Sequence, residues 1–430
     1  MDESVSKPSF REALIFWLKL GCISFGGPAG QIALMQRELV DRRKWIGERT
    51  FLHALNFCFL LPGPEAQQLA TYCGWLMHGV RGGLVAGLLF VLPSAVLLWL
   101  LSWFYVEFGT LAWVSAVFDG LQSAVLAIVV ASVWRIGRRV LRTPVMWGLA
   151  VGAFTVLFFG MVTFPWVVVA AAGVGLMAAR YGWVGLEAAD VESSGVESSL
   201  AGAGRAALFR AVWVLAAGLA LWWLPVVVSV WGLGHEHAVT QQGFFFSKVA
   251  VVTFGGAYAV LPYVSQQAVG HFGWLTQAQM MDGLALAETT PGPLVMVLSF
   301  VGFIGGWQHP GLLPPLAAAS LGALLTLWTT FVPSFLWIFL GAPVMESLRQ
   351  VAWLRVVLAA VTAAVVGVIL NLAAWLAVAV VWWPETGAVN WFGVGLAAAA
   401  LMALNGLKWN VVTVIAASAA LGVIWWTVVR

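Results

Sequence analysis

Long apolar runs, separated by short polar segments, cover most of the 430-residue chain. An α-helix needs about 17–25 predominantly apolar residues to cross the hydrocarbon core of a bilayer. Nine runs approach or exceed this length, and each predicts a helix: Gly83–Phe104, Leu111–Trp134, Pro144–Phe159, Thr163–Ala179, Ala211–Trp231, Leu316–Leu340, Val351–Val381, Trp391–Leu404 and Val411–Val429.

Four further apolar segments contain glycine and proline near their middle. Gly26-Gly27-Pro28 and Pro62-Gly63-Pro64 interrupt residues 16–39 and 51–77. Gly255-Gly256 and Pro291-Gly292-Pro293 interrupt residues 244–269 and 280–303. Proline removes a helical hydrogen bond and clashes with the preceding turn, and glycine weakens a helix further. We therefore expect four broken helices, which either return as hairpins to the side they entered or cross the bilayer.

The composition excludes a soluble globular protein. Hydrophobic residues make up 62% of the chain and charged residues 9%, whereas soluble domains carry about 25% charged residues. A β-barrel, the other architecture that spans membranes, has short alternating strands in place of long apolar runs. The expected fold class is therefore an all-α polytopic membrane protein.

The basic residues indicate an orientation if each broken segment is a hairpin. On that assumption nearly every Lys and Arg falls on one face, including Arg42-Arg43-Lys44 and the group Arg135, Arg138 and Arg139. The positive-inside rule makes that face cytoplasmic.

The two halves of the chain resemble each other when one is shifted along the other by a single constant interval, without gaps. Lys19 then corresponds to Lys248, Phe25-Gly26-Gly27 to Phe254-Gly255-Gly256, and Pro62-Gly63-Pro64 to Pro291-Gly292-Pro293. A stretch rich in Ser, Gly and acidic residues, 187–200, divides the halves. We expect an N-terminal repeat (1–186), a polar linker (187–210), a connecting span (211–231) and a C-terminal repeat (232–430).

The charge bias changes sides between the two repeats. The basic loop at residues 36–45 corresponds to residues 265–274, which contain no Lys or Arg. The connecting span adds the odd crossing that would invert the second copy. Inverted repeats with discontinuous helices are typical of secondary transporters, which hold their substrate near the membrane midplane.

Four motifs resemble the chromate ion transporter family in its long, two-domain form. They are FGGP at 25–28, PGPEAQQLATYCGW at 62–75, FGGAYAVLPYV at 254–264 and GLALAETTPGP at 283–293. The resemblance covers nearly the whole chain. It implies export of chromate across the bacterial inner membrane and hence chromate resistance. His53 and Phe59 stand where the second repeat has Asp282 and Glu288, so any role of those acids belongs to one repeat.

A site for a tetrahedral dianion needs hydrogen-bond donors and positive potential. A helix N-terminus offers free N–H groups and a partial positive charge, and glycine lets a ligand approach the backbone. We expect the breaks to supply four such ends around one cavity, at Gly26, Gly27, Gly63, Gly255, Gly256 and Gly292. The alternative is that these glycines are kinks at which helices pack closely.

Four side chains are further candidates for binding the anion. Lys19 and Lys248 lie in otherwise apolar stretches, each six residues before a Phe-Gly-Gly break. Two related cations inside the protein would balance a dianion, unless both side chains extend to the membrane interface. Gln67 and Thr290 are candidate neutral donors, with a purely structural role as the alternative.

Three acidic residues are candidates for proton coupling. Glu288 precedes Pro291 in an apolar segment, and Asp282 lies six residues before Glu288. A neutral, buried glutamic acid that ionises when the substrate leaves would link transport to the proton gradient. Asp282 can instead cap a hairpin mouth, and Glu65, directly after Pro62-Gly63-Pro64, can cap a helix start.

Other classes of function lack a signal in the sequence. No HExxH, GxSxG or P-loop constellation is present, so neither an enzyme nor ATP-driven transport is expected. We expect no cofactor, no metal site and no nucleic-acid partner, and interpret His235-Glu236-His237 as a polar loop. The expected partners are a chromate- or sulfate-like oxyanion and membrane lipid, with a homodimer left open. A sulfate transporter and an uncoupled anion channel remain alternatives.

Overall fold

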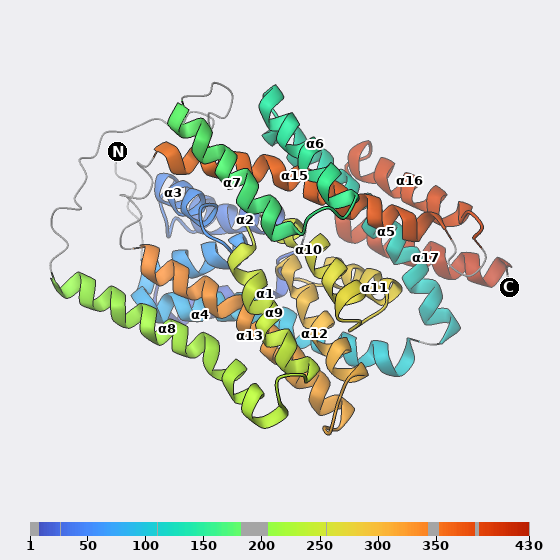
Figure 1. The fold of residues 1–430 in the computed structure, drawn as a ribbon, viewed down its shortest axis with the longest axis horizontal. Coiled ribbons are helices and arrows are strands. Elements are labelled where there is room, and N and C mark those ends of the chain that lie inside the picture. The colour runs from blue at the N-terminus through green and yellow to red at the C-terminus, as the bar shows by residue number, and fades with distance from the viewer. Residues whose placement is uncertain are drawn as a thin grey trace.

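The fold is built almost entirely from α-helices, as the computed structural model in Figure 1 shows. The structure describes residues 8–25, 27–109, 111–181, 205–254, 256–342, 352–382 and 387–429. Within these residues the only extended pairing is an isolated bridge between Trp382 and Val389. Seven of the described helices are long and apolar enough to cross a membrane. The predicted all-α, multi-pass membrane fold is therefore confirmed.

The first half begins with short, interrupted helices and continues with long ones. In chain order its elements are α1 (Phe10–Ile23), α2 (Gly27–Gln36), the π-helical turn η1 (Arg37–Arg42), α3 (Glu48–Cys58), α4 (Glu65–Phe108), α5 (Ala112–Val140), α6 (Pro144–Phe158) and α7 (Phe164–Tyr181). Ser9 caps α1 through a reciprocal pair of hydrogen bonds with Glu12. The helices end and restart at the glycine and proline motifs, where a continuous helix would be costly.

The second half repeats this order after one additional helix, α8 (Arg205–Leu233). Its elements are α9 (Ala238–Val252), α10 (Ala257–Ser265), the π-helical turn η3 (Gln266–His271), α11 (Gln277–Thr289), the 3₁₀ turn η4 (Leu294–Met296), α12 (Val297–Gln308), α13 (Pro315–Gly341), α15 (Ala352–Val381), α16 (Trp391–Asn405) and α17 (Val411–Val429). The two π-helical turns coincide at both ends under the same shift that places Lys19 on Lys248. The direction of the second copy relative to the bilayer stays a prediction.

Helix α4 is folded back on itself. His78 and Gly79 have non-helical backbone angles, with φ +62° at Gly79, and the two arms on either side pack together. A methyl group on Gly74 would collide with the carbonyl oxygen of Gly82, and one on Gly87 with the side chain of Thr71. The two arms therefore form an antiparallel hairpin, in the place that α12 and α13 occupy in the second half.

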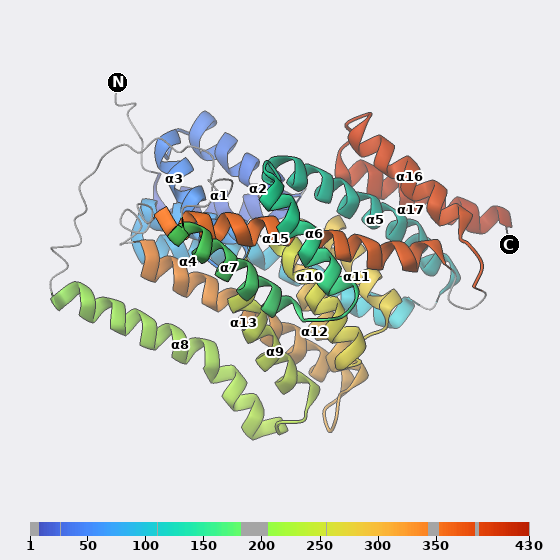
Figure 2. The ribbon, with the colours of Figure 1, turned by 45° about the horizontal axis from the view of Figure 1, so that its top comes forward.

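The two halves exchange their last helices. The long helix α15 packs along α6 and α7, whereas α5 packs against α16 and α17, an arrangement visible in Figures 1 and 2. Gly120 lets α5 touch the backbone of α17, and Gly175 lets α7 touch α15. Small residues permit such close approach between membrane helices, so the halves interlock.

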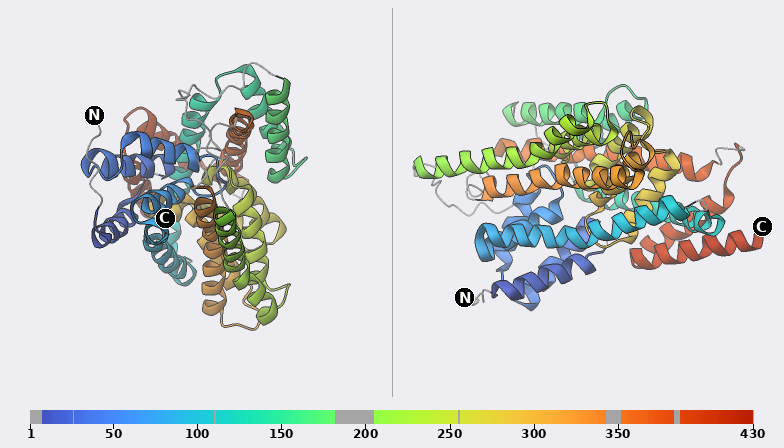
Figure 3. Two further views of the ribbon diagram at one scale, coloured as in Figure 1. Left: turned by 90° about the vertical axis from the view of Figure 1, so that its left-hand side faces the viewer. Right: turned by 90° about the horizontal axis from the view of Figure 1, so that it is seen from below.

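Helix α8 lies at the edge of the molecule. It packs against α13 and α9, and Figure 3 shows it running alongside α13. Trp328 of α13 donates its indole N–H to the carbonyl oxygen of Leu221 at 2.7 Å. Most of the remaining surface of α8 is apolar and exposed, including Trp213, Leu224 and Trp231. A surface of this kind suits contact with lipid rather than water.

Candidate functional site

The two repeats meet at two reciprocal backbone hydrogen bonds. The N–H of Gly63 donates to the carbonyl oxygen of Thr253, and the N–H of Gly292 donates to that of Ser24, both at 2.8 Å. Ser24 and Thr253 end the first helix of each repeat, so each proline-glycine-proline loop contacts the helix break of the other repeat. The junction brings four sequence motifs to one place in the fold.

Glycine is required at these breaks by the backbone itself. Gly27, Gly63, Gly256 and Gly292 have φ values of +68°, +128°, +89° and +110°, a region that other L-residues enter at a cost. Helices α2, α10 and α4 begin at or directly after these loops. Their first N–H groups have no partner within the helix. Gly26 and Gly255 lie outside the described residues.

Two serines pack directly against the loop glycines. A methyl group on Gly63 would lie 2.6 Å from Ser334 Oγ, and one on Gly292 would lie 2.6 Å from Ser94 Oγ. Both hydroxyls are buried, and neither has a hydrogen-bond partner in the described part of the chain. An unpaired buried hydroxyl is costly. The junction therefore holds polar groups that the protein does not satisfy by itself.

Three glutamines add further unsatisfied polar atoms. Gln31 is fully buried and donates to the carbonyl oxygens of Ser24 and Gly292. The Nε2 of Gln68 donates to the carbonyl oxygen of Pro62 at 2.8 Å, and that of Gln67 to Thr71 Oγ1 at 3.0 Å. The Oε1 atoms of Gln31, Gln67 and Gln68 have no hydrogen-bond partner among the described atoms. Because an amide can donate as well as accept, these side chains can rearrange toward a ligand.

Thr290 lies beside the second loop. Its side chain is 5% exposed, and its hydroxyl donates to the carbonyl oxygen of Ala287 at 3.1 Å. Its own backbone N–H donates to Leu286 and ends α11. The hydroxyl therefore already has a partner and would have to rotate to reach a ligand.

Glu65 and Glu288 each approach the first turn of α10, at Gly256 and at Tyr258. A methyl group on Gly256 would lie 3.4 Å from Glu65 Oε1, so this carboxyl faces the N-terminus of α10, where a negative charge is favoured. Arg139 of α5 interacts with Glu65 electrostatically. The hydroxyl of Tyr258 donates to Glu288 Oε1 at 2.7 Å, and the side chain of Glu288 is 7% exposed. A carboxyl from each repeat therefore borders the same helix start.

Asp282 belongs to a separate polar cluster. The hydroxyl of Tyr105 and the amide of Gln122 each donate to its carboxyl oxygens at 2.8 Å, and Asp119 is close enough to interact electrostatically. Tyr105 lies near the end of α4 and Gln122 in α5, so the cluster connects α11 to these two helices.

Lys19 and Lys248 lie on exposed faces of α1 and α9. Neither residue is buried, which agrees with the alternative that both side chains extend to the membrane interface, and their role in binding the anion stays a prediction. On a helix with one packed face, a residue is buried or exposed according to the face on which it lies. Phe16 and Leu20 of α1 are buried, and Lys19 lies beside them on the outer face.

Sequence reasoning missed several residues of the junction. Gln31 gave no local signal, Tyr258 stood out only as part of a family motif, and Arg139 only as one of the basic residues that indicate the orientation. Ser94 and Ser334 did leave a local signal, because both follow a proline within a long apolar run, at Pro93-Ser94 and Pro333-Ser334. Among the described residues, no group of three or more His, Cys, Asp or Glu is placed to hold a metal.

The chain belongs to the chromate transporter family, whose model matches residues 11–176 and 240–423. It is similar to the chromate transport protein of Pseudomonas aeruginosa, with 33% identity over 371 residues that cover 85% of this chain and 81% of the relative. It is also similar to the chromate transport protein of Cupriavidus metallidurans, with 28% identity over 362 residues, 84% of this chain and 81% of the relative. A probable chromate transport protein of Synechococcus elongatus is 29% identical over 347 residues, 78% of this chain and 76% of the relative. No solved structure matches the chain significantly.

Proposed function

We propose that this protein is a secondary active transporter that exports chromate across the bacterial inner membrane, coupled to protons, and thereby confers chromate resistance. The proposal rests on membership of the chromate transporter family and on two relatives whose names state chromate transport. Chromate is a tetrahedral dianion, so the transporter must replace its hydration shell with donors inside the bilayer.

The main structural support for an anion site is the junction of the two repeats. In a chain with 9% charged residues, it gathers positive-φ glycines, helix N-termini and buried polar atoms without partners. Such N-termini favour anions through their free N–H groups and their dipoles. We infer that the anion binds here, at the breaks around Gly26, Gly27, Gly63, Gly255, Gly256 and Gly292, with Gln67 and Thr290 as neutral donors.

Proton coupling is assigned to the carboxyls that border this junction. Glu288 is buried and has Tyr258 as a hydrogen-bond donor, so a proton taken up or released here would change the charge beside the anion. Glu65 faces the same helix start from the other repeat. Asp282, held by Tyr105 and Gln122, would act at a distance from the junction. Releasing a proton when the anion leaves would restore negative charge to the site, and taking one up when the anion binds would offset the charge of the anion.

The test is uptake of labelled chromate by inside-out membrane vesicles under an imposed proton gradient. We expect uptake that falls when the gradient is collapsed. Absence of uptake of both chromate and sulfate would exclude oxyanion transport. Uptake of sulfate alone would identify a sulfate transporter, and uptake that ignores the gradient would identify a channel.

The variant Glu288→Gln tests the coupling residue. Gln keeps an acceptor for Tyr258 but cannot exchange a proton. We expect residual chromate uptake that no longer responds to the gradient. Glu107→Gln, the same change at an exposed carboxyl, is the matched control and should respond as the wild type does. A gradient response that survives in Glu288→Gln would remove this residue from the mechanism.

A further inference from the structure

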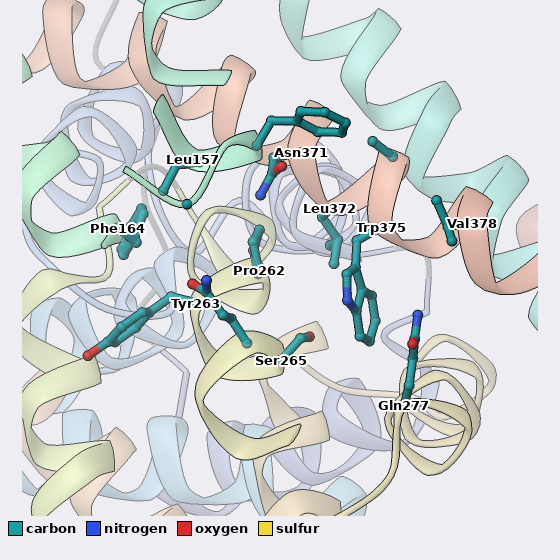
Figure 4. A pocket seen from close by; sticks show the side chains of 14 residues that line it. Leu157, Phe164, Pro262, Tyr263, Ser265, Gln277, Asn371, Leu372, Trp375 and Val378 are labelled. Carbon is teal, nitrogen blue, oxygen red and sulfur yellow. The ribbon is translucent and has the colours of Figure 1, made fainter. Parts of the chain in front are cut away.

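A cavity lined by apolar and neutral polar side chains lies away from the junction, and it points to a second place where the anion binds. The cavity has a volume of about 390 Å³. It is lined by the turn between α6 and α7, the end of α10, the start of α11 and the C-terminal half of α15 (Figure 4). None of the residues that line it, all of which are in the described part of the chain, carries a formal charge.

Several polar side chains of this cavity can donate hydrogen bonds. Figure 4 shows the amides of Asn371 and Gln277, the indole of Trp375 and the hydroxyl of Ser265 around one space. An indole N–H can only donate, and an amide offers two donors. Ser265 is 2% exposed, and its Oγ has no hydrogen-bond partner in the described structure. A cavity with several possible donors and no carboxylate can accept an oxyanion.

The cavity has a counterpart in the first repeat. Under the shift that places Lys19 on Lys248, Pro262, Tyr263 and Gln266 correspond to Ala33, Leu34 and Arg37. The latter three line a second cavity together with Asn410, Val412 and Thr413. Asn410 ends the turn between α16 and α17, and Val412 and Thr413 lie in the first turn of α17; this turn takes the place of the turn between α6 and α7. The two cavities therefore occupy equivalent positions in the two repeats.

The equivalent cavities differ in charge. Arg37 in one is replaced by Gln266 in the other. The helix α5, which corresponds to α15, carries Arg135 and Arg138 near its end, whereas α15 has Trp375 and Val378 there. A cationic cavity raises the local concentration of a dianion, whereas a neutral cavity binds the dianion through hydrogen bonds alone. If the anion passes from one cavity to the other, it would be captured at the cationic cavity and released from the neutral one.

We propose that the cavity of Ser265, Asn371 and Trp375 is a second oxyanion subsite, which takes a tetrahedral dianion through neutral donors and from which the anion leaves on the side opposite Arg37. This inference rests on the proposed transport function. It adds a site outside the junction and gives a structural reason for the direction of transport.

The test uses sulfate trapped inside vesicles, on the side of the membrane opposite Arg37, where it competes with chromate for the proposed subsite. Vesicles of both orientations are prepared, and a reporter fused after Lys44 identifies the face of Arg37. In the wild type we expect trapped sulfate to slow chromate uptake from the Arg37 side. In Asn371→Leu and Trp375→Phe we expect about tenfold more trapped sulfate to be needed for the same relative inhibition, since one hydrogen bond to an anion is lost.

Trp353→Phe is the matched control, because it removes the same indole N–H from the same helix at a residue 52% exposed and outside the cavity. It should keep the inhibition of the wild type. Inhibition that is unchanged in both cavity variants would overturn the subsite.

A direct binding measurement separates this inference from the proposed function. If vesicles of the wild type take up no chromate, the transport proposal fails, and labelled sulfate is then bound to the purified full-length chain at equilibrium. The double variant Asn371→Leu, Trp375→Phe should bind one sulfate fewer per chain than the wild type. Equal numbers of bound sulfate would overturn the subsite whatever the transport result.

Discussion

At the scale of single residues, the loop glycines serve two separate purposes that a matched pair of variants can distinguish. Gly63 has a positive φ and also faces Ser334 Oγ, whereas Gly79 has a positive φ with no atom within 4 Å of an added methyl group. Ala in these glycine-favouring conformations costs on the order of 1–3 kcal/mol. A methyl group forced into a packed contact costs roughly 1–3 kcal/mol more.

We therefore expect Gly63→Ala to lose more stability than Gly79→Ala. The measurement is the free energy of unfolding of the purified chain in mixed micelles. Removing the opposing hydroxyl in Gly63→Ala, Ser334→Ala should recover part of the difference. Equal losses in the two single variants would mean that the contact with Ser334 contributes nothing.

The lysine pair gives a second prediction at this scale. Lys19 and Lys248 are exposed on α1 and α9, so neither residue is packed against the buried polar groups of the junction. We expect Lys19→Ala and Lys248→Ala to change the KM for chromate by less than about twofold. Measured initial uptake rates over a range of chromate concentrations check this. A large increase in KM in both variants would instead support the hypothesis that these lysines bind the dianion directly.

At the scale of elements, the hairpin inside α4 depends on glycine contacts. A side chain on Gly74 would meet the backbone of Gly82 and the side chain of Ala86, whereas Gly152 of α6 has no atom within 4 Å of an added methyl group. We expect Gly74→Ala to destabilise the protein by roughly 1–3 kcal/mol. Gly152→Ala should be neutral or stabilising by up to about 1 kcal/mol, because Ala is the better helix former. Thermal unfolding of both variants in one detergent gives the comparison, and similar melting temperatures would argue against the close packing of the two arms.

The sequence predicts elements of this fold better than it predicts their contacts. Glycine and proline act locally on the backbone, so the interruptions near Gly27, Gly63 and Gly292 could be placed by reading residues alone. The only sequence indication of the hairpin turn at His78–Gly79 was the break between two apolar segments. The packing of Ser334 against Gly63 joins residues far apart in the chain, and no local pattern determines such a pair. Exposure of Lys19 depends on which face of α1 is covered, which is a property of the tertiary fold.

At the scale of the whole molecule, the exchange of helices predicts that the two halves need each other. Because α15 packs along α6 and α7 while α5 packs against α16 and α17, the main packing partners of each long helix lie in the other half. We expect a chain cut between residues 190 and 200 to assemble when both fragments are expressed together. Each fragment alone should be degraded or aggregate. Co-purification through a tag on one fragment measures assembly, and a stable single fragment would contradict the exchange.

The opposite orientation of the repeats is the last prediction at this scale. Lys44 and Gly273 correspond to each other in the two repeats and both have left-handed backbone angles, with φ +52° and +63°, so the loops they belong to are built alike. The first loop carries Arg42 and Arg43, while the second has no Lys or Arg between residues 265 and 274. Basic loops stay in the cytoplasm, and α8 adds one further crossing between the repeats. A reporter fused after Lys44 should therefore be cytoplasmic and one fused after Gln267 periplasmic. If both reporters lie on the same side, the repeats are parallel, and the cationic and neutral cavities would then open toward the same side of the membrane.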